Sequence, residues 1–372
     1  MKKHGMSRRS VIGTTLTGAF AGALGLSSLG RAAEASVRRS ELKFAGYAYD
    51  RVRAIQDGRL ELEGHTSSFH AGNIYALSAS AFGPAKTYEI TEIGLIPYMT
   101  RFANKDFREY VLLPIFISRI FRHRNIFVRP DRGIEKPEDL RGKRVATPGY
   151  GMSACTWIRG FLQDQHGVKP GDMHWTETTA SSDGGKLPGG SLDRYLLPDG
   201  FPIEKGPPGV DESRMLTEGK VDALITAVTP KAFLEGHPDV KRLFPDFRSA
   251  ERDYYSKTGV FPIMHVVAIR KDVVEANPEL PKQVFELYSQ AKQLAYDDLE
   301  TTTALKVTLP WVTQEFDETR ALMGDNYWSY GVEANRKPLE LLMRYTHEQG
   351  LTRRKLNIEE LFHPSTLELR EA

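Results

Sequence analysis

The sequence has 372 residues, of which 40% are hydrophobic and 26% charged, so the chain can bury a sizeable core and form two domains of ordinary size. Its formal net charge is only +2 at pH 7, which gives no support to a nucleic-acid-binding protein. The single cysteine, Cys155, excludes an intramolecular disulfide and argues against a cysteine-based zinc or iron–sulfur site.

The N-terminal segment has the features of an export signal. Arg8 and Arg9 precede an uncharged stretch at residues 12–30, and small residues surround Ala35. This pattern predicts a twin-arginine signal peptide over residues 1–35, cleaved after Ala35, and a periplasmic protein. The segment holds five basic residues and one acidic residue, so its removal lowers the net charge by four, to −2. An uncleaved membrane anchor is the alternative, and it too places the body outside the cytoplasm.

Apolar, partly β-branched runs alternate with helix-like segments in the first part of the chain. We expect strands at residues 42–47, 88–93, 111–116 and 126–128, and a helix at residues 73–82. Such alternation is typical of an α/β sheet with helices on its faces.

The same alternation continues in the middle of the chain. Residues 137–148 predict a short helix or turn followed by a strand, and residues 154–164 predict a helix with Ser153 as its N-cap. The loop that holds Tyr150 can bring backbone N–H groups to an anion, although an ordinary capped helix explains the pattern equally well. Cys155 stands at the start of this helix, where a buried structural thiol is commoner than a catalytic one.

A segment rich in glycine and proline at residues 181–209 predicts a long loop or edge insertion. Regular structure then resumes with a helix at residues 213–218 and strands at residues 221–227 and 263–269. The C-terminal region is mainly helical, and residues 281–299 form its clearest amphipathic helix.

This order of elements predicts an α/β protein with two lobes and a ligand cleft between them. We expect the first lobe to be discontinuous, formed by residues 36–130 and 261–372, and the second lobe to comprise residues 131–260.

Several segments together resemble the 4,5-dihydroxyphthalate decarboxylase family, and the resemblance runs from about Leu42 to Phe362. The segments SRIFRH and FPIMH are the most specific to that family, whereas EDLRGKRV occurs widely in solute-binding proteins. The matching segments are YDR at 49–51, QDGR at 56–59, SRIFRH at 118–123, EDLRGKRV at 138–145, WIRG at 157–160, FPIMH at 261–265, YW at 327–328, YG at 330–331 and NR at 335–336.

The resemblance implies the fold of type 2 periplasmic binding proteins, with a central cleft between two α/β lobes and a helical C-terminal region. It also implies a carboxy-lyase that decarboxylates or binds an aromatic carboxylate in that cleft. Residues 65–86 depart from the family pattern.

The segment at residues 118–123 is the main candidate for binding an anion. Arginine grips a carboxylate through two parallel hydrogen bonds, so Arg119 and Arg122 are suited to hold the substrate, with Ser118 beside them and His123 as a proton donor. A solvated basic turn is the alternative interpretation.

Other candidates lie near the ends of expected strands. His265 is a second candidate proton donor, although a histidine at this apolar strand is also typical of a satisfied core residue. Arg51 and Glu92 are candidate ligand-binding residues from the first lobe, and Thr226 could hydrogen-bond a ligand from the second, together with Tyr150 and Ser153 of the loop described above.

No cofactor is expected from the sequence. The histidine pairs His65/His70 and His166/His174 lack a recognised ligand spacing, so a divalent metal stays an open alternative.

Two functions fit these observations. The first is decarboxylation of an aromatic acid, in which arginines hold one carboxylate and a histidine protonates the ring carbon as carbon dioxide leaves. The alternative is an exported solute-binding protein that delivers an anionic small molecule to a membrane permease. We expect a small-molecule carboxylate as ligand, no nucleic acid, and the twin-arginine export machinery as a partner.

Overall fold

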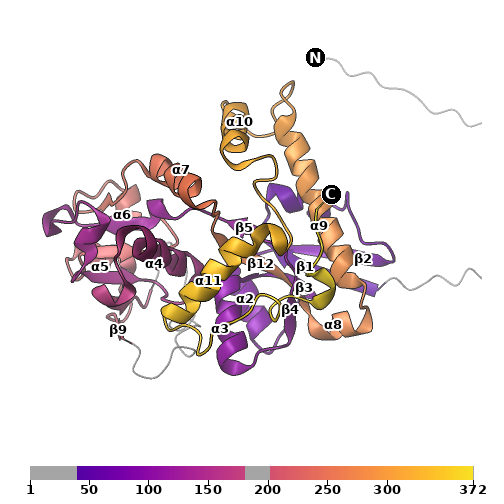
Figure 1. Ribbon diagram of the computed structural model, residues 1–372, viewed down its shortest axis with the longest axis horizontal. Helices are drawn as coiled ribbons and strands as arrows, with labels where there is room; N and C mark the ends of the chain where they lie inside the picture. The colour runs from indigo at the N-terminus through magenta and orange to yellow at the C-terminus, as the bar shows by residue number, and fades with distance from the viewer. Residues whose placement is uncertain (1–39, 181–201, 372) are drawn as a thin grey trace, which may run out of the picture. The chain divides into compact units, whose positions relative to one another are not determined.

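The computed structural model describes residues 40–180 and 202–371 (Figure 1). The export signal predicted over residues 1–35 lies outside the described residues, as does most of the loop predicted over residues 181–209. Two six-stranded sheets carry the fold, so the expected α/β class is confirmed. The predicted lobe boundaries near residues 130 and 260 stay a prediction.

The first sheet has the order β2-β1-β3-β12-β4, and β5 pairs with β12 beside β4. Strands β1, β2 and β3 run parallel, whereas β12 is antiparallel to β3, β4 and β5. β12 therefore enters the centre of a sheet whose other strands come from much earlier in the chain. The strands are β1 (Ser40–Gly46), β2 (His65–Ala71), β3 (Ile90–Gly94), β4 (Tyr110–Leu112), β5 (Ser118–Arg119) and β12 (Ile263–Arg270).

The second sheet has the order β11-β6-β10-β7-β8-β9. Strands β10, β7, β8 and β9 are parallel, and β6 is antiparallel to both of its neighbours. The strands are β6 (Ile126–Val128), β7 (Arg144–Thr147), β8 (His174–Glu177), β9 (Ile203–Lys205), β10 (Ala223–Ile225) and β11 (Lys241–Arg242).

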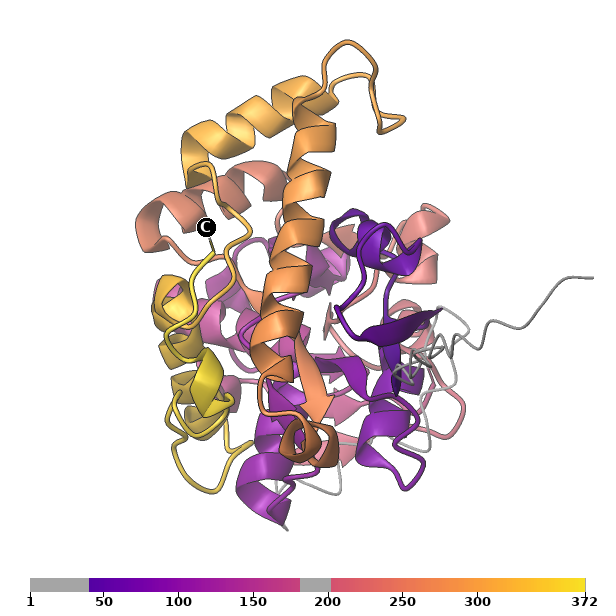
Figure 2. The ribbon, with the colours of Figure 1, turned by 90° about the vertical axis from the view of Figure 1, so that its right-hand side faces the viewer.

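Helices cover both sheets. Figure 2 shows α9 crossing one face of the first sheet, where its apolar side packs on β1 and β12. The helices are α1 (Arg53–Gln56), α2 (Ile74–Phe82), α3 (Leu95–Lys105), α4 (Ser153–His166), α5 (Glu212–Thr217), α6 (Lys231–Leu234), α7 (Phe247–Thr258), α8 (Lys271–Ala276), α9 (Leu280–Glu300), α10 (Val312–Met323) and α11 (Arg336–Glu348).

Short 3-10 turns join these elements. Among the described residues, no helix has the length and apolar character that crossing a bilayer requires. The turns are η1 (Asp50–Val52), η2 (His123–Asn125), η3 (Pro130–Arg132), η4 (Pro137–Leu140), η5 (Pro170–Asp172), η7 (Glu333–Asn335) and η8 (Pro364–Thr366).

One apolar core extends from the first sheet through α4 to the second sheet. Ile93 on β3, Ile158 on α4 and Ile225 on β10 are all fully buried in it. Separate apolar clusters fill the outer faces, under α9 on the first sheet and under α5 and α6 on the second. The central strands β3, β6 and β12 are therefore buried on both faces and read as apolar runs, whereas β2 and the first half of β1 carry exposed polar residues.

Three predicted elements need correction. The strand expected at residues 111–116 ends at Leu112; beyond it, the Leu113 N–H and the Ile115 carbonyl oxygen both pair with Val267, so the regular ladder is interrupted around Pro114. The loop expected at residues 181–209 contains strand β9 in its described part. Ser153 is the first residue of α4 rather than its N-cap, which is Met152.

Candidate functional site

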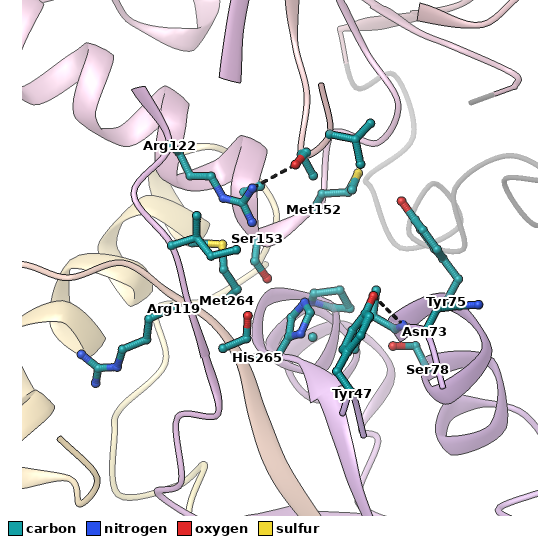
Figure 3. A pocket seen from close by; sticks show the side chains of 18 of the residues that line it. Tyr47, Asn73, Tyr75, Ser78, Arg119, Arg122, Met152, Ser153, Met264 and His265 are labelled. Carbon is teal, nitrogen blue, oxygen red and sulfur yellow. Dashed lines mark hydrogen bonds between the residues drawn. The ribbon is translucent and has the colours of Figure 1, made fainter. Parts of the chain in front are cut away.

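A cavity of about 630 Å³ opens between the two sheets and is lined by residues from both. Tyr47, Arg51 and His265 line it from the first sheet, and Met152 and Ala227 line it from the second. Figure 3 shows Tyr47 and His265 on one side of this space and Met152 on the other. The volume is within the range of about 300–1,000 Å³ typical of small-molecule sites.

The charge of the lining is one-sided. Five arginines and one histidine line the cavity, and no aspartate or glutamate of the described residues does. Low-dielectric walls strengthen the field of such cations, so the cavity favours an anionic ligand. The lining arginines are Arg51, Arg101, Arg119, Arg122 and Arg124.

His265 is the only histidine among the described lining residues. The register of β12 against β5 shifts between Ile263 and His265, and such irregularities re-aim side chains. The imidazole stacks on the Tyr47 ring with centroids 6.2 Å apart, and its Nδ1 lies 2.6 Å from Glu92 Oε1. Because Nδ1 is bound to Glu92, Nε2 is the ring nitrogen that can contact a ligand in the cavity.

Glu92 lies behind His265 on β3 and is only 2% exposed. Its Oε2 accepts a hydrogen bond from the Tyr47 backbone N–H at 2.9 Å. Its Oε1 accepts one from the Tyr49 hydroxyl at 2.8 Å, in addition to the contact with His265. The carboxylate therefore supports the wall of the cavity without being part of it.

Arg122 enters the cavity from the turn before η2. Its Nη1 donates to the Ala227 carbonyl oxygen at 3.0 Å (Figure 3). This bond joins the turn after β5 of the first sheet to the segment after β10 of the second. Among the described residues, no carboxylate forms an ion pair with Arg122, and its Nε has no hydrogen-bond partner. Burial lowers the pKa of Arg122 to about 10, so the group stays charged at neutral pH; the Glu251 carboxylate acts on it electrostatically without forming an ion pair.

The turn that carries Arg122 packs against α7. Burial raises the pKa of Glu251 on α7, and the positive charges of Arg124 and Arg122 act on it in the opposite direction. Arg124 is exposed and also lines the cavity. One turn therefore supplies two cationic side chains to the site.

Arg51 forms an aromatic–cationic layer at another wall. Its guanidinium lies 3.9 Å from the Tyr49 ring centroid and 4.0 Å from that of Trp328. Two of its nitrogens donate to the Ile117 carbonyl oxygen, at 2.9 and 2.6 Å. Its Nη1 also forms an ion pair with Asp50 Oδ1 at 3.1 Å, so these contacts fix its position while Asp50 offsets part of its charge.

The N-terminal end of α4 also faces the cavity, through Met152, Ser153 and Ala154. The Ser153 hydroxyl accepts a hydrogen bond from the Ile96 N–H at 3.3 Å, which joins α4 to α3. The dipole of this 14-residue helix places partial positive charge at its first turn, which adds to the positive potential of the arginines.

No group of three or more His, Cys, Asp or Glu side chains within residues 40–180 and 202–371 is arranged to hold a metal ion. The pairs His65/His70 and His166/His174 accordingly form no such cluster.

Two curated proteins resemble the chain over most of their length. The 4,5-dihydroxyphthalate decarboxylase of Comamonas testosteroni is 36% identical over 330 residues, which cover 88% of this chain and 98% of that protein. The chain belongs to the 4,5-dihydroxyphthalate decarboxylase family. The enzyme of the same name from Pseudomonas putida is 34% identical over 221 residues, or 59% of this chain and 83% of the relative.

The fold of this family member resembles that of periplasmic binding proteins. A putative periplasmic sulfonate-binding protein of an ABC transporter from Methylobacillus flagellatus aligns with a TM-score of 0.50 at 17% identity, covering 88% of this chain and 92% of that structure. The expected periplasmic-binding-protein fold is therefore confirmed. No protein-family model matches the chain.

The structure of this decarboxylase-family chain brings six of the ten predicted site residues to the cavity. They come from η1, β5, the turn after β5, α4 and β12, so residues far apart in the sequence meet there. The six are Arg51, Ser118, Arg119, Arg122, Ser153 and His265.

His123 does not line the cavity. It is 2% exposed, and its ring stacks on Phe161 with centroids 4.2 Å apart, beside Phe244 and Tyr254. Burial lowers the pKa of His123 to about 4. The structure thus gives His123 a place in the core as a neutral ring, which corrects its expected role as a proton donor.

Three further candidates also lie outside the lining. Glu92 is behind His265, as described above. Tyr150 is buried against Arg159, whose guanidinium carbon lies 3.6 Å from the Tyr150 ring centroid. Thr226 is fully buried, and its Oγ1 accepts a hydrogen bond from the Val228 N–H at 3.3 Å. These positions correct the expectation that the three side chains contact a ligand.

Arg119 reaches the lining without directing its charge there. Figure 3 shows its guanidinium pointing away from the cavity. Its Nη2 donates to the Ser329 carbonyl oxygen at 3.2 Å and to Asn335 Oδ1. Of the two arginines predicted to hold a carboxylate, the structure leaves Arg122 for that role.

The sequence reasoning assigned no role to several lining residues. Tyr49 and Trp328 lie within the family-like segments YDR and YW, which was the available signal. Met264 lies within the segment FPIMH in the same way. The other residues lie in none of the family-like segments; they are Tyr47, Asn73, Tyr75, Ser78, Phe82, Arg101, Arg124 and Met152.

Proposed function

We propose that this chain is a carboxy-lyase that removes one carboxylate from an ortho-dihydroxylated aromatic dicarboxylate of the 4,5-dihydroxyphthalate type. The observation that carries the proposal is the position of His265, the only histidine among the described lining residues, in a cavity lined by five arginines and no described carboxylate. Family membership gives independent support, because both curated relatives bear this decarboxylase name.

The proposed reaction needs one proton per turnover. In 4,5-dihydroxyphthalate each carboxylated ring carbon stands para to a hydroxyl, whose electrons make that carbon basic. The His265 imidazolium gives the proton at Nε2, and a C–H bond forms from the ring electrons. The carbon–carbon bond to the carboxylate then breaks, its electron pair returns to the ring, and carbon dioxide leaves.

Arg122 is the proposed anchor for the carboxylate that stays. It is buried, charged and without an anionic partner among the described residues, so a substrate carboxylate supplies the missing charge. Arg51 and the first turn of α4 add positive potential that favours binding of a substrate with two carboxylates. The products are 3,4-dihydroxybenzoate and carbon dioxide.

A second candidate function is suggested by the likeness to a sulfonate-binding protein and by the N-terminal Arg8-Arg9 pair. In that case the chain is exported by the twin-arginine machinery, resides in the periplasm and delivers an anionic aromatic ligand to a membrane permease. This alternative uses the same cavity and the same arginines but gives His265 no chemical step.

Turnover assays of the purified chain test the proposal. We expect 4,5-dihydroxyphthalate to release carbon dioxide and to raise the melting temperature of the protein. His265→Gln should lower kcat by about 10²–10⁴-fold, the usual contribution of a positioned acid, while the ligand still stabilises the protein. His174→Gln is the matched control, because His174 is exposed and far from the lining.

Two results would contradict the decarboxylase. Thermal stabilisation by the ligand without any carbon dioxide would indicate the solute-binding alternative. Full turnover in His265→Gln would remove His265 from the reaction.

A further inference from the structure

The carboxylate of Glu92 has an unusual environment for a buried charge. It is 2% exposed, and its two oxygens contact the Tyr47 backbone N–H, the Tyr49 hydroxyl and His265 Nδ1. A buried carboxylate is costly unless hydrogen bonds and an opposite charge compensate it.

No lysine or arginine within the described residues forms an ion pair with Glu92. Its one ion-pair partner there is His265, with Nδ1 and Oε1 separated by 2.6 Å. The tyrosine hydroxyl and the backbone amide are neutral donors. Among the described residues, His265 is therefore the one side chain within ion-pair distance of this carboxylate that can carry a positive charge.

We propose that Glu92 and Tyr49 are positioning residues that hold His265 as a proton donor, with Nδ1–H bound to Glu92 and Nε2–H presented to the cavity. The proposal rests on the proposed function, in which His265 protonates the ring carbon. It deepens that function by naming what orients and charges the acid.

The direction of each hydrogen bond follows from chemistry. Glu92 is an acceptor at both oxygens, so Nδ1 must carry a proton whether His265 is neutral or charged. When Nε2 gives its proton to the substrate, His265 becomes the neutral Nδ1–H form and Glu92 stays ionised. Water then returns one proton to Nε2, which completes the balance for each turnover.

Tyr49 acts on the same oxygen as His265. Burial and the neighbouring Glu92 raise the pKa of Tyr49, so its hydroxyl keeps its proton and donates to Oε1. Its ring lies beneath the Arg51 guanidinium, which fixes the tyrosine from the cavity side. The hydrogen bond from Tyr49 thus fixes the position of Glu92 Oε1. Glu92 Oε1 in turn fixes the orientation of the His265 ring.

Kinetics of two variants test this arrangement. Glu92→Gln keeps the size of the side chain and removes its charge; we expect kcat for 4,5-dihydroxyphthalate to fall by about 10²–10⁴-fold, with KM changed by less than about threefold. Tyr49→Phe removes one donor; we expect kcat to fall by about 3–10-fold with KM again unchanged. A variant that is only less stable would not show a lower kcat together with an unchanged KM.

Matched controls come from the same elements. Glu89 precedes β3, binds Arg270 and does not line the cavity, so Glu89→Gln should keep wild-type kcat. Tyr98 is a buried tyrosine whose hydroxyl donates to the Tyr110 carbonyl oxygen, so Tyr98→Phe controls for the loss of a buried hydroxyl.

Proton NMR provides a readout that does not depend on turnover. A short Nδ1–H···Oε1 bond gives a far-downfield proton resonance, which should be present in the wild type and in Tyr49→Phe and lost in Glu92→Gln and His265→Gln. If Glu92→Gln does not fold, the wild-type resonance and the kinetics of Tyr49→Phe decide.

The two proposals fail in distinguishable ways. A wild type without turnover contradicts the proposed function, and the resonance then still tests the pairing of His265 with Glu92. A wild type with turnover that depends on His265, together with wild-type kcat in Glu92→Gln, overturns the positioning role alone. Absence of the downfield resonance in the wild type overturns it as well.

Discussion

Arg119 and Arg122 show how two residues of one short segment reach different surroundings. Arg119 lies on β5 and sends its guanidinium to Ser329 and Asn335. Arg122 follows three positions later, after the strand has ended, and binds the Ala227 carbonyl oxygen at the cavity. The sequence indicates an anion-binding cluster, but which arginine serves it depends on contacts with residues about 100 and 200 positions away.

The first prediction separates these two arginines. Arg122→Gln should raise KM for 4,5-dihydroxyphthalate by about 10–100-fold, because one charged hydrogen bond contributes about 1.5–3 kcal/mol. Arg119→Gln should lower the free energy of unfolding by about 1–3 kcal/mol and leave KM unchanged, since its partners are structural. Steady-state kinetics and urea unfolding of both variants check this. Equal KM values would show that Arg122 does not hold the substrate.

The candidate site was predictable only in part. Arg51, Ser118, Arg122 and His265 stand near strand ends in family-like segments, and all four line the cavity. His123 carries the same motif signal, yet it faces Phe161, because a single step along the turn points the next side chain into the core. No local pattern in one sequence records which way such a turn points.

At the scale of elements, the close contact between α4 and α11 depends on Gly160. A Cβ atom built at this position would meet the ring of Tyr345 on α11. The same ring packs edge-on against Trp157, and its hydroxyl donates to Asp164, so it has little freedom to move. Gly160 is therefore required for the approach of the two helices.

We therefore expect Gly160→Ala to destabilise the protein. An alanine in a helix is ordinarily favoured over glycine by up to about 1 kcal/mol, whereas overpacking here should cost about 1–3 kcal/mol net. The free energy of unfolding in urea measures the difference. Gly171→Ala is the control, since no atom lies within 4 Å of its Cβ position. A stabilised Gly160→Ala variant would show that Tyr345 gives way.

The elements themselves were partly readable from sequence. Apolar runs located β3, β6 and β12, which are buried on both faces, and β1, whose second half is buried. Strand β2 was missed because its sequence HTSSFHA is polar; it lies at a sheet edge, where one side faces solvent. Its place is set by pairing with β1, which is a tertiary effect.

At the scale of the whole molecule, stability should depend on pH through His123. Burial lowers the pKa of this histidine to about 4 in the folded chain, from its ordinary value of 6.5. The unfolded chain thus binds a proton more readily than the folded one between these values. Folding stability is therefore fully present above pH 6.5 and falls as the pH drops towards 4.

His123→Phe tests this dependence. Between pH 6.5 and 4, protonation of His123 in the unfolded chain should lower the unfolding free energy of the wild type by about 3 kcal/mol. The variant lacks this contribution, so its unfolding free energy should fall by about 3 kcal/mol less over the same range. Phenylalanine preserves the stacking on Phe161, so the two curves should be close near neutral pH. Urea unfolding at several pH values gives both curves. Parallel curves would mean that His123 is accessible to protons in the folded state.

The position of β12 has a consequence for synthesis on the ribosome. This strand carries His265 and lies between β3 and β4, although the whole second sheet is encoded before it. A nascent chain that has not yet extended beyond residue 270 holds Glu92 without its histidine partner and has an open slot beside β3. His265 and the central strand of the first sheet arrive together, so a translation product that ends before β12 cannot form this cavity wall.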